Sequence, residues 1–547
     1  MSYMPIKDYK NILFIMLPYI VRKKEAKNPK IRSFSAFPYG LLSIATFLEM
    51  NSQKEINIKI IDCNLDENRD YIQAIKHSLS DFKPDLVGLS MMFDNSYTHL
   101  KDISQLIKEH DREIVVVLGG SAASSSYDTI MSEQECLDGI CYLEGELPLL
   151  RLIDSDNPIE YLENDPSWVT RKSLEEAKRP EKSFIEDLND VIDIDYKFVD
   201  IEKYDMQEAF SPFISNKFER KRQFFLVTSR GCPYKCIFCS NSSIHGNKIR
   251  YASVDNIISH VQHLVNEFNM NILTIYDDQL LSKKKRAKEL FRRLEPFHLR
   301  IECPNGLSVA FIDEEMAYLM KRAGMDTVAL AIESGSKYML EKVIHKPLKL
   351  EMVKPVVEIL RRHDFFIEGF FVTGIPGETD EYREETLNLI RDVELDWSGF
   401  SLATPIRGSK LYELCIENEY IDKNLKIGEI EDKRYILKIP GQNPDDITRQ
   451  TYLMNLDVNF VNNYRMKIGD YRVASNCFQD VIMRYENHAF AHYYLAKAQA
   501  AMDSKAEQTQ ANMLKFHEII DNDDTWKEYA AYFNLDINEE RVGAYYD

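Results

Sequence analysis

The chain has 547 residues, which is enough for three or four domains of the usual size. Its 68 Lys and Arg against 88 Asp and Glu give a formal charge of −20 at pH 7, which argues against a nucleic-acid partner. The apolar fraction of 44% is that of a folded protein, and no apolar stretch is long enough to cross a bilayer, so we expect no membrane partner.

Residues 1–150 carry the pattern of a doubly wound, Rossmann-like α/β domain. Short apolar runs alternate with segments in which apolar residues recur at helical spacing. Strands are predicted at 11–17, 56–61, 85–90, 114–118 and 139–143, and helices at 39–49, 71–82 and 99–108. Strands that are apolar throughout indicate a parallel sheet covered on both faces, and such sheets bind ligands beyond the carboxyl ends of their strands.

Residues 223–425 resume the alternation after a polar, locally acidic stretch at 151–222, which we predict to be a linker. Strands are predicted at 224–229, 271–276, 299–303, 327–332, 366–373 and 397–403, and helices at 255–268, 283–294 and 352–362. Six strand–helix units are fewer than the eight of a closed TIM barrel, so we predict a partial (β/α)6 TIM-like barrel. Its open side would suit a large substrate.

Residues 426–547 are predicted to form a helical C-terminal domain, because 445–535 show no strand pattern. Segments 469–471 and 489–496 resemble parts of one tetratricopeptide unit, which cannot bury its own apolar face and therefore needs flanking helices. Such a module either holds a peptide or carrier protein or closes the open side of the barrel. The acidic segment from residue 501 to the end is predicted to be a solvated tail.

Three of the nine cysteines fall within eight positions, directly after the first strand of the predicted barrel. No signal-peptide pattern precedes the first apolar run, so we expect a cytoplasmic protein whose thiols stay reduced. The run Cys232-Pro-Tyr-Lys-Cys236-Ile-Phe-Cys239 has the spacing Cys-x3-Cys-x2-Cys. Thiolates are the usual ligands of iron–sulfur clusters, and three of them can hold a [4Fe–4S] cluster whose fourth iron stays open to a small chelating molecule. Structural zinc wants four ligands, and His245, the candidate for the fourth, lies beyond the usual spacing.

This cysteine motif resembles that of the radical S-adenosylmethionine (SAM) superfamily. The resemblance covers about residues 220–425, because further motifs of that family have counterparts at the ends of the predicted strands. These counterparts are Ile275-Tyr-Asp-Asp278, Ala331-Ile-Glu-Ser-Gly-Ser336, Thr373-Gly-Ile-Pro-Gly-Glu-Thr379 and Thr404-Pro-Ile-Arg-Gly-Ser409. In TIM-like barrels the carboxyl ends of the strands carry the active site.

The resemblance implies a set of cofactor contacts at these positions. The implied ligands of the cluster are Cys232, Cys236 and Cys239. The implied SAM contacts are Phe238 and the turn Gly374, Ile375 and Pro376 at the adenine, Glu333 and Ser334 at the ribose or methionine part, and Asp277 at the end of the second strand.

A doubly wound domain that precedes such a barrel resembles the cobalamin-binding domain of class B radical SAM enzymes. The matching loops follow the third, fourth and fifth predicted strands, and the implied cobalamin-binding residues are Ser90, Gly119, Gly120, Ser121, Glu144 and Gly145. Glycines there would let the backbone approach the ligand closely. The first loop, from Pro18 to Phe37, contains no histidine, so we predict that no protein imidazole binds cobalt. A domain that has lost cobalamin is the alternative.

The function that the resemblance implies is that of a cobalamin-dependent radical SAM methyltransferase acting on an unactivated carbon. In that family the reduced cluster cleaves SAM to a 5′-deoxyadenosyl radical, which removes a hydrogen atom from the substrate, and methylcobalamin then delivers the methyl group. The rival functions are a non-methylating radical SAM reaction (cyclisation or rearrangement, with or without cobalamin) and a binding or scaffold protein built on the helical domain. The expected partners are a small-molecule or peptide substrate and an electron donor such as flavodoxin or ferredoxin.

Overall fold

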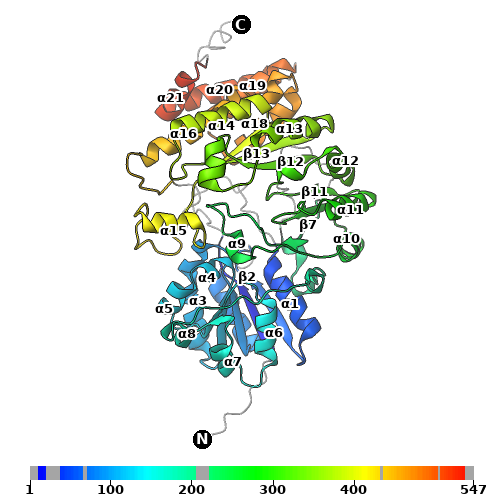
Figure 1. Ribbon diagram of the computed structural model, residues 1–547, viewed down its shortest axis with the longest axis vertical. Coiled ribbons are helices and arrows are strands. Elements are labelled where there is room, and N and C mark those ends of the chain that lie inside the picture. The colour runs from blue at the N-terminus through cyan, green and yellow to red at the C-terminus, as the bar shows by residue number, and fades with distance from the viewer. Residues whose placement is uncertain are drawn as a thin grey trace.

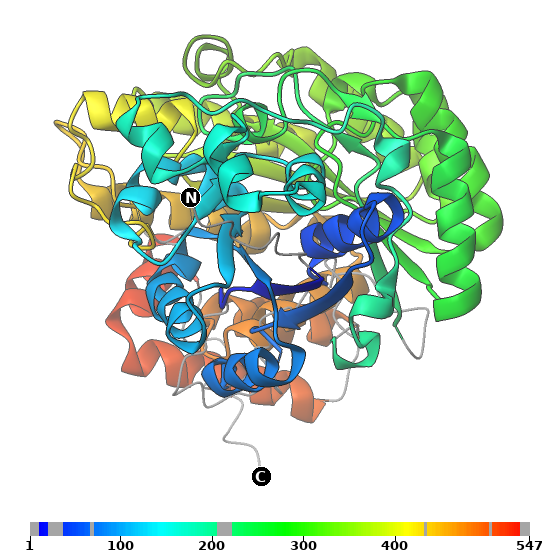
Figure 2. The same cartoon turned by 90° about the horizontal axis from the view of Figure 1, so that it is seen from below.

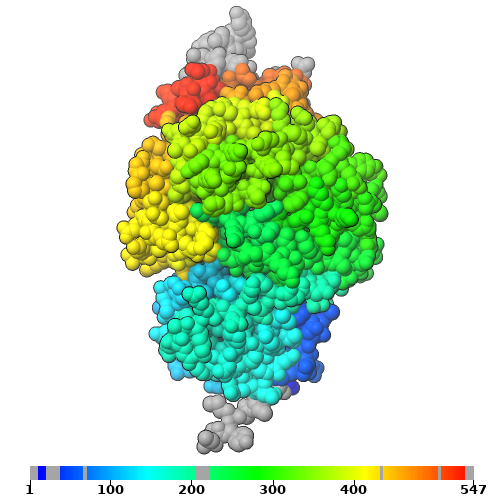
Figure 3. Space-filling model, in the orientation of Figure 1, coloured from blue at the N-terminus to red at the C-terminus, as the bar shows by residue number. Residues whose placement is uncertain are grey.

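The computed structural model of the chain describes residues 10–19, 37–65, 70–204, 221–430, 435–502 and 506–535. An N-terminal sheet domain, a barrel and a layer of C-terminal helices follow one another along the long axis (Figure 1). The space-filling view shows the three parts in direct contact (Figure 3). The predicted fold class is therefore confirmed. Within the described ranges, none of the helices has the length and apolar character that a bilayer span requires.

The N-terminal domain is built on one six-stranded sheet with the order β2-β1-β3-β4-β5-β6. Its strands are β1 (Asn11–Met16), β2 (Asn57–Asp62), β3 (Leu86–Ser90), β4 (Val115–Gly119), β5 (Gly139–Cys141) and β6 (Trp168–Val169). The first five strands run parallel and β6 pairs antiparallel with β5. All five predicted strands are present at the predicted places.

Helices cover both faces of this sheet, as the view from below shows (Figure 2). One face packs against α1 (Tyr39–Asn51) and α6 (Glu146–Asp154), and the other against α2 (Tyr71–Phe82), α3 (Tyr97–His110) and α5 (Tyr127–Glu133). Alternate side chains of β1 enter opposite cores: Ile12 and Phe14 join one, and Leu13 and Ile15 join the other. A strand buried on both faces needs apolar residues at every position, which is why β1 reads as a continuous apolar run.

The register of the sheet aligns the carboxyl ends of its strands. Met16 at the end of β1 is paired with Asp62 of β2 and with Ser90 of β3, and Ser90 is in turn paired with Gly119 of β4. Two of the positions predicted to bind cobalamin, Ser90 and Gly119, are thus neighbours at one edge.

Residues 151–204 are more ordered than the predicted linker. The sheet continues past residue 150 into β6, and α7 (Pro158–Asn164) and α8 (Arg171–Glu175) flank this added strand. Further along, Ile185, Leu188 and Ile192 are buried in the core of the barrel. Single apolar residues spaced between polar ones carry these contacts, so no periodic pattern announces them in the sequence. Residues 205–220 lie outside the described ranges.

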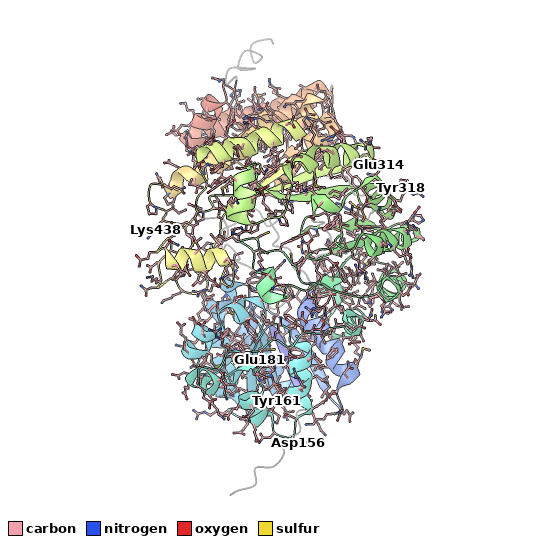
Figure 4. All side chains as sticks on the ribbon, in the orientation of Figure 1. Asp156, Tyr161, Glu181, Glu314, Tyr318 and Lys438 are labelled. Carbon is pink, nitrogen blue, oxygen red and sulfur yellow. The ribbon has the colours of Figure 1, made fainter. Side chains whose placement is uncertain are left out.

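The barrel consists of two three-stranded parallel sheets joined by an isolated bridge between Leu307 and Leu330. The strands are β7 (Gln223–Leu226), β10 (Ile272–Ile275), β11 (Arg300–Glu302), β12 (Thr327–Glu333), β13 (Phe366–Thr373) and β14 (Trp397–Leu402). The outer helices are α10 (Val254–Phe268), α11 (Lys284–Leu294), α12 (Glu314–Ala323), α13 (Val353–Arg362) and α14 (Asp380–Val393). Glu314 and Tyr318 of α12 project from the outer surface (Figure 4). All six predicted strands are present, which confirms the partial (β/α)6 arrangement.

The C-terminal part is helical, as predicted. Its main helices are α16 (Pro444–Leu456), α18 (Tyr471–Arg484), α19 (Ala489–Ala501), α20 (Ala506–Asn522) and α21 (Asp524–Tyr532), whereas α15 (Lys410–Glu417) follows β14 within the predicted barrel. The prediction of a solvated tail from residue 501 is wrong for α21, where Ala530 is buried, and for α20, where Met513, Phe516 and Ile520 are buried against α19 and its neighbours. These three residues are spaced as one face of a helix, and the acidic composition of the segment hides that spacing.

The helical domain covers the exposed edge of β14. Asn459, in the π-helical turn after α16, accepts a hydrogen bond from the backbone N–H of Ser398 (2.7 Å) and donates one to the carbonyl oxygen of Ser398 (2.8 Å). Arg465 pairs with the buried carboxylate of Asp396 at 2.5 Å just before the same strand. An unpaired strand edge invites association with other chains, so this contact supports the role of closing the barrel over that of holding a partner.

His488 caps the first turn of α19 inside the aromatic core of the helical domain. Its Nδ1 accepts a hydrogen bond from the backbone N–H of Ala491 (3.1 Å), and its Nε2 lies 3.2 Å from the hydroxyl of Tyr452. The rings of Phe460 and Trp526 lie 4.8 Å from its own. Burial lowers the pKa of His488 from 6.5 to about 3.

We expect the helical domain to lose stability as the pH falls from about 6.5 towards 3, because the unfolded chain binds a proton at His488 in this window and the folded chain does not. Asn is a good N-cap residue that does not titrate, so His488→Asn should lose less melting temperature than the wild type between pH 7 and pH 5. Thermal unfolding followed by circular dichroism at both pH values measures this. Equal losses in the two proteins would assign the pH dependence to another group.

Candidate active site

The three clustered cysteines lie on a loop whose base is a short two-stranded ladder. β8 (Ser229–Arg230) pairs antiparallel with β9 (Arg250–Tyr251), and residues 231–249, here called the cysteine loop, run between them. The backbone N–H of Gly231 donates to Asp278 (3.1 Å), and that of Cys232 donates to the carbonyl oxygen of Gly246 (3.1 Å). Gly231 has a φ of +104°, and a Cβ there would lie 2.4 Å from the carbonyl oxygen of Lys248, so only glycine fits this turn.

The three thiols make few hydrogen bonds to the described part of the protein. Cys232 Sγ accepts a hydrogen bond from the Gln279 side chain and Cys239 Sγ accepts one from the backbone N–H of Asn241, each at 3.5 Å. Burial raises the pKa of Cys236 to about 12, although the charge of Lys346 acts against this rise. These thiols therefore need the positive charge of a bound metal centre to ionise at neutral pH.

The donor set fits an iron–sulfur cluster better than a single metal ion. Over the part of the chain that the structure describes, no three His, Cys, Asp or Glu side chains converge on one point as a single ion requires. In a cluster each thiolate binds a different iron, so convergence on one point is not needed. His245, the candidate fourth zinc ligand, faces Glu144 at 3.8 Å instead. The cluster is therefore the better account of the three cysteines.

Glu333 and Ser334, predicted to contact SAM, end β12 next to the cysteine loop. Glu333 has a φ of +72° and accepts a hydrogen bond from the Lys346 Nζ at 3.1 Å. Lys346 is also close enough to Cys232 and Cys236 for its charge to act on both thiols. Ser334 is buried and lies 3.3 Å from the Thr386 hydroxyl. Sequence reasoning missed Lys346 because it follows a π-helical turn, Met339–Ile344, that carries no motif.

The predicted adenine contacts gather in one place. Ile375 is fully buried in the same apolar cluster as Ile237 of the cysteine loop, Phe238 packs against that cluster, and Pro376 is half-buried. Gly374 has a φ of +77°, and its carbonyl oxygen accepts a hydrogen bond from the Tyr435 hydroxyl at 2.7 Å. The turn after β13 and the loop after β7 are thus brought together, as the motif pattern predicts.

Asp277 has a structural environment that the sequence did not reveal. Its carboxylate accepts hydrogen bonds from the backbone N–H and hydroxyl of Thr228 (2.5 and 2.6 Å) and from the hydroxyl of Ser229 (2.7 Å). Both oxygens are engaged, so the side chain ties the end of β10 to the end of β7. Its neighbour Asp278 lies closer to the cysteine loop, where it accepts a hydrogen bond from the Asn241 side chain at 2.7 Å.

The loops after β3 and β4 form the half-exposed edge predicted to bind cobalamin. The Ser121 hydroxyl donates to the carbonyl oxygen of Met92 (2.9 Å), which ties the two loops together at the start of α4 (Ser121–Ser125). Gly120 has a φ of +111°, and a Cβ there would lie 2.3 Å from the carbonyl oxygen of Met91. Among the described residues, only Cys141 approaches a Cβ at Gly119, at 3.9 Å. The edge therefore leaves room for a ligand at Gly119, while Gly120 is required by the fold itself.

Glu144 and Gly145, also predicted to bind cobalamin, are used inside the protein. The two Glu144 oxygens accept hydrogen bonds from the two Arg250 guanidinium nitrogens, at 2.6 and 2.8 Å. A Cβ at Gly145 would lie 2.9 Å from Ile44 Cδ1, so the glycine allows α1 and α6 to pack.

Most of the first loop, residues 20–36, lies outside the described ranges. The prediction that this loop supplies no histidine to cobalt therefore falls mostly on residues that the structure does not describe.

The carboxyl edge of the N-terminal sheet meets the part of the barrel that follows β7. Arg230, at the base of the cysteine loop, pairs with Glu146 of the N-terminal domain at 2.9 Å. The hydroxyl of Tyr39 accepts a hydrogen bond from the backbone N–H of Val227 (3.1 Å). α4 contacts α9 (Asn241–Ile244) of the cysteine loop, which lies at the boundary of the two parts in Figure 1. The predicted cobalamin edge and the cysteine loop thus face the same region.

Two family models match the chain in this order: the B12 binding domain at residues 32–153 and the radical SAM superfamily at residues 226–390. An uncharacterised methyltransferase of Pyrococcus horikoshii is 28% identical over 70% of this chain and 79% of its own. The cytidylyl-2-hydroxyethylphosphonate methyltransferase of Streptomyces wedmorensis is 27% identical over 74% of this chain and 82% of its own.

A relative with another reaction matches as well. The anaerobic magnesium-protoporphyrin IX monomethyl ester cyclase of Rubrivivax gelatinosus is 25% identical over 71% of this chain and 67% of its own. Among solved structures, the radical SAM methyltransferase TsrM of Kitasatospora setae, with cobalamin and a [4Fe–4S] cluster bound, superposes with a TM-score of 0.63. It is 14% identical over 90% of this chain and all of its own, a likeness that shows the fold.

Proposed function

Because a B12 binding model and a radical SAM model match the chain in that order, we propose that it is a cobalamin-dependent radical SAM methyltransferase that transfers a methyl group to an unactivated carbon. The observation that supports this most is the meeting of the cysteine loop and the predicted cobalamin edge at one interface. A substrate held there would face both cofactors at once. When bound, the cluster with SAM supplies a radical that removes hydrogen, and cobalamin supplies the methyl group.

The residues of the chain hold these groups and shield them. Cys232, Cys236 and Cys239 would hold the cluster on a loop fixed by backbone hydrogen bonds. Lys346 and Glu333 place a paired charge beside it, where the amino and carboxylate groups of SAM would bind. A substrate held between the two domains would be shielded from water, which would protect a reactive intermediate from side reactions.

The second candidate is a non-methylating reaction such as cyclisation, which the match to a cyclase over 71% of the chain supports. The two candidates share the cofactor sites and differ in the product. The substrate would be a small molecule or a peptide, and the cluster would need an electron donor such as flavodoxin or ferredoxin. Reduced thiols and an iron–sulfur cluster suit the cytoplasm, which we propose as the location.

The decisive experiment needs no knowledge of the substrate at first. The protein is reconstituted anaerobically with iron and sulfide and then incubated with a reductant, hydroxocobalamin and SAM carrying a deuterated methyl group. We expect 5′-deoxyadenosine and deuterated methylcobalamin, and then a methylated product when candidate metabolites or peptides are added, read by mass spectrometry. Release of 5′-deoxyadenosine without any methyl transfer to cobalamin would favour the second candidate. The absence of both would refute a radical SAM function.

A further inference from the structure

Four charged side chains form a buried network between the N-terminal domain and the barrel, here called the junction cluster: Glu144, Glu146, Arg230 and Arg250. Arg250 binds both oxygens of Glu144, and Arg230 lies 3.4 Å from Glu144 and 2.9 Å from Glu146. All four side chains are between 3 and 10% exposed. Two carboxylates and two guanidinium groups balance, so the cluster carries no net charge.

The two arginines lie at the two ends of the cysteine loop. Arg230 and Arg250 are direct partners in the β8–β9 ladder that closes the cysteine loop. Arg250 also donates to the carbonyl oxygen of His245 (3.1 Å), near the carboxyl-terminal end of that loop, and to the carbonyl oxygen of Ile185 (2.6 Å). The two glutamates flank Gly145 at the turn from β5 into α6, and Glu146 accepts a hydrogen bond from Ser43 of α1 as well (3.0 Å). The network therefore ties the base of the cysteine loop to the carboxyl edge of the first sheet.

Stability alone is a poor account of this network. Removing ions from water is costly, and well-packed apolar residues of similar volume are often as stable as a buried ion pair or more so. What a bidentate guanidinium–carboxylate contact adds over apolar packing is a fixed direction and distance. At this place the fixed quantity is the position of the cysteine loop relative to the predicted cobalamin edge.

We propose that the junction cluster is a positioning device that holds the iron–sulfur site and the cobalamin site in one geometry. This inference rests on the proposed function. Glu144 and Arg250 are its central positioning residues, because the Arg250 guanidinium binds both carboxylate oxygens of Glu144. Glu144 thus acts through the cysteine loop rather than by touching a ligand.

The chain offers a matched control at the other end of the barrel. Asp396 and Arg465 also form a buried ion pair between two parts of the chain, with side chains 0 and 17% exposed. Asp396→Asn should therefore destabilise the protein much as Glu144→Gln does, since each removes one charge from a buried pair. It should leave the cysteine loop unaffected, because that pair contacts β14 and the helical domain.

The test compares Glu144→Gln, Arg250→Lys and Asp396→Asn with the wild type as full chains. In the protein without cofactors, we expect faster hydrogen exchange in residues 231–249 for the first two variants only. After reconstitution, Glu144→Gln should form 5′-deoxyadenosine about tenfold more slowly and change the electron paramagnetic resonance spectrum of the SAM-bound cluster, as loss of an outer-shell partner does elsewhere. Arg250→Lys keeps the charge but loses the bidentate contact, so it should show the same changes to a smaller extent.

Several results would overturn the proposal. One is a rate of 5′-deoxyadenosine formation that falls in proportion to the loss of melting temperature in all three variants, Asp396→Asn included. Another is a Glu144→Gln variant whose hydrogen exchange in residues 231–249, paramagnetic resonance spectrum and rate of 5′-deoxyadenosine formation all equal those of the wild type. If Glu144→Gln does not fold, the milder Arg250→Lys decides alone, and wild-type behaviour there rejects the idea. A wild-type protein that binds no iron would instead refute the proposed function, which separates the two failures.

Discussion

Replacement of Cys232, Cys236 and Cys239 together by alanine should reduce bound iron and 5′-deoxyadenosine formation to background, with little loss of melting temperature. The loop does not depend on its thiols for its shape. Backbone hydrogen bonds hold it, from Cys232 to Gly246 (3.1 Å) and from Ile237 to Ile344 (2.9 Å). Three thiolates are the whole protein ligand set of such a cluster, so no other side chain can replace them. Iron and sulfide analysis, the visible spectrum and a SAM-cleavage assay measure the effect.

A cysteine far from the site gives the matched control. Cys477 is buried in α18 of the helical domain, next to Phe366, so Cys477→Ala removes a buried thiol without touching the loop. We expect this variant to keep its iron and its activity. Iron retained by the triple variant would show that the cluster is held elsewhere and that the central assignment is wrong.

Much of the architecture could be predicted because it depends on local patterns. A strand buried on both faces must be apolar at every position, and this alone locates β1, β3 and β4. The cysteine spacing is equally local, and so are the turns that follow β12 and β13. These features can be recognised in a single sequence because residues close together in the chain produce them.

Side-chain partners could not be predicted in the same way. Asp277 and Glu144 stand in motif-like positions at strand ends, where a carboxylate facing a ligand is a natural expectation. The structure gives each of them partners from distant parts of the chain instead: Thr228 for Asp277 and Arg250 for Glu144. Only the packing of one element on another decides whether such a carboxylate faces a ligand or closes an interface.

The roles of the two glycines at the predicted cobalamin edge could not be told apart from the sequence for the same reason. Gly119 and Gly120 look alike in the sequence, and a bulky residue at either would be expected to occupy the space of the ligand. The backbone distinguishes them. Gly120 is needed because of its positive φ and its contact with Met91, whereas Gly119 lies on a regular strand with free space beside it. A substitution at Gly120 would therefore test folding rather than binding.

Gly119→Leu should keep the fold and abolish cobalamin binding, whereas Gly120→Leu should fail to fold stably. At Gly119 an added Cβ meets only Cys141 within 4 Å among the described residues, and this position is the last of β4, at the carboxyl edge of the sheet. That edge is where doubly wound domains bind their ligands. Equilibrium dialysis with hydroxocobalamin measures binding, and circular dichroism measures folding. Gly119→Leu should still form the iron–sulfur cluster and cleave SAM, because the cysteine loop belongs to the barrel.

The visible spectrum of bound cobalamin adds a separate test of the missing histidine. We expect a wild-type complex in which the dimethylbenzimidazole has left cobalt and no protein nitrogen replaces it. His99 follows the loop after β3 and is the first histidine to test, but its Nδ1 is hydrogen-bonded at 3.0 Å to the hydroxyl of Tyr71, the first residue of α2. A nitrogen-ligated spectrum that His99→Ala removes would contradict this placement. A wild-type protein that binds no cobalamin, yet cleaves SAM, would transfer the function to the non-methylating class, because the methyl donor of the proposed reaction would have no site.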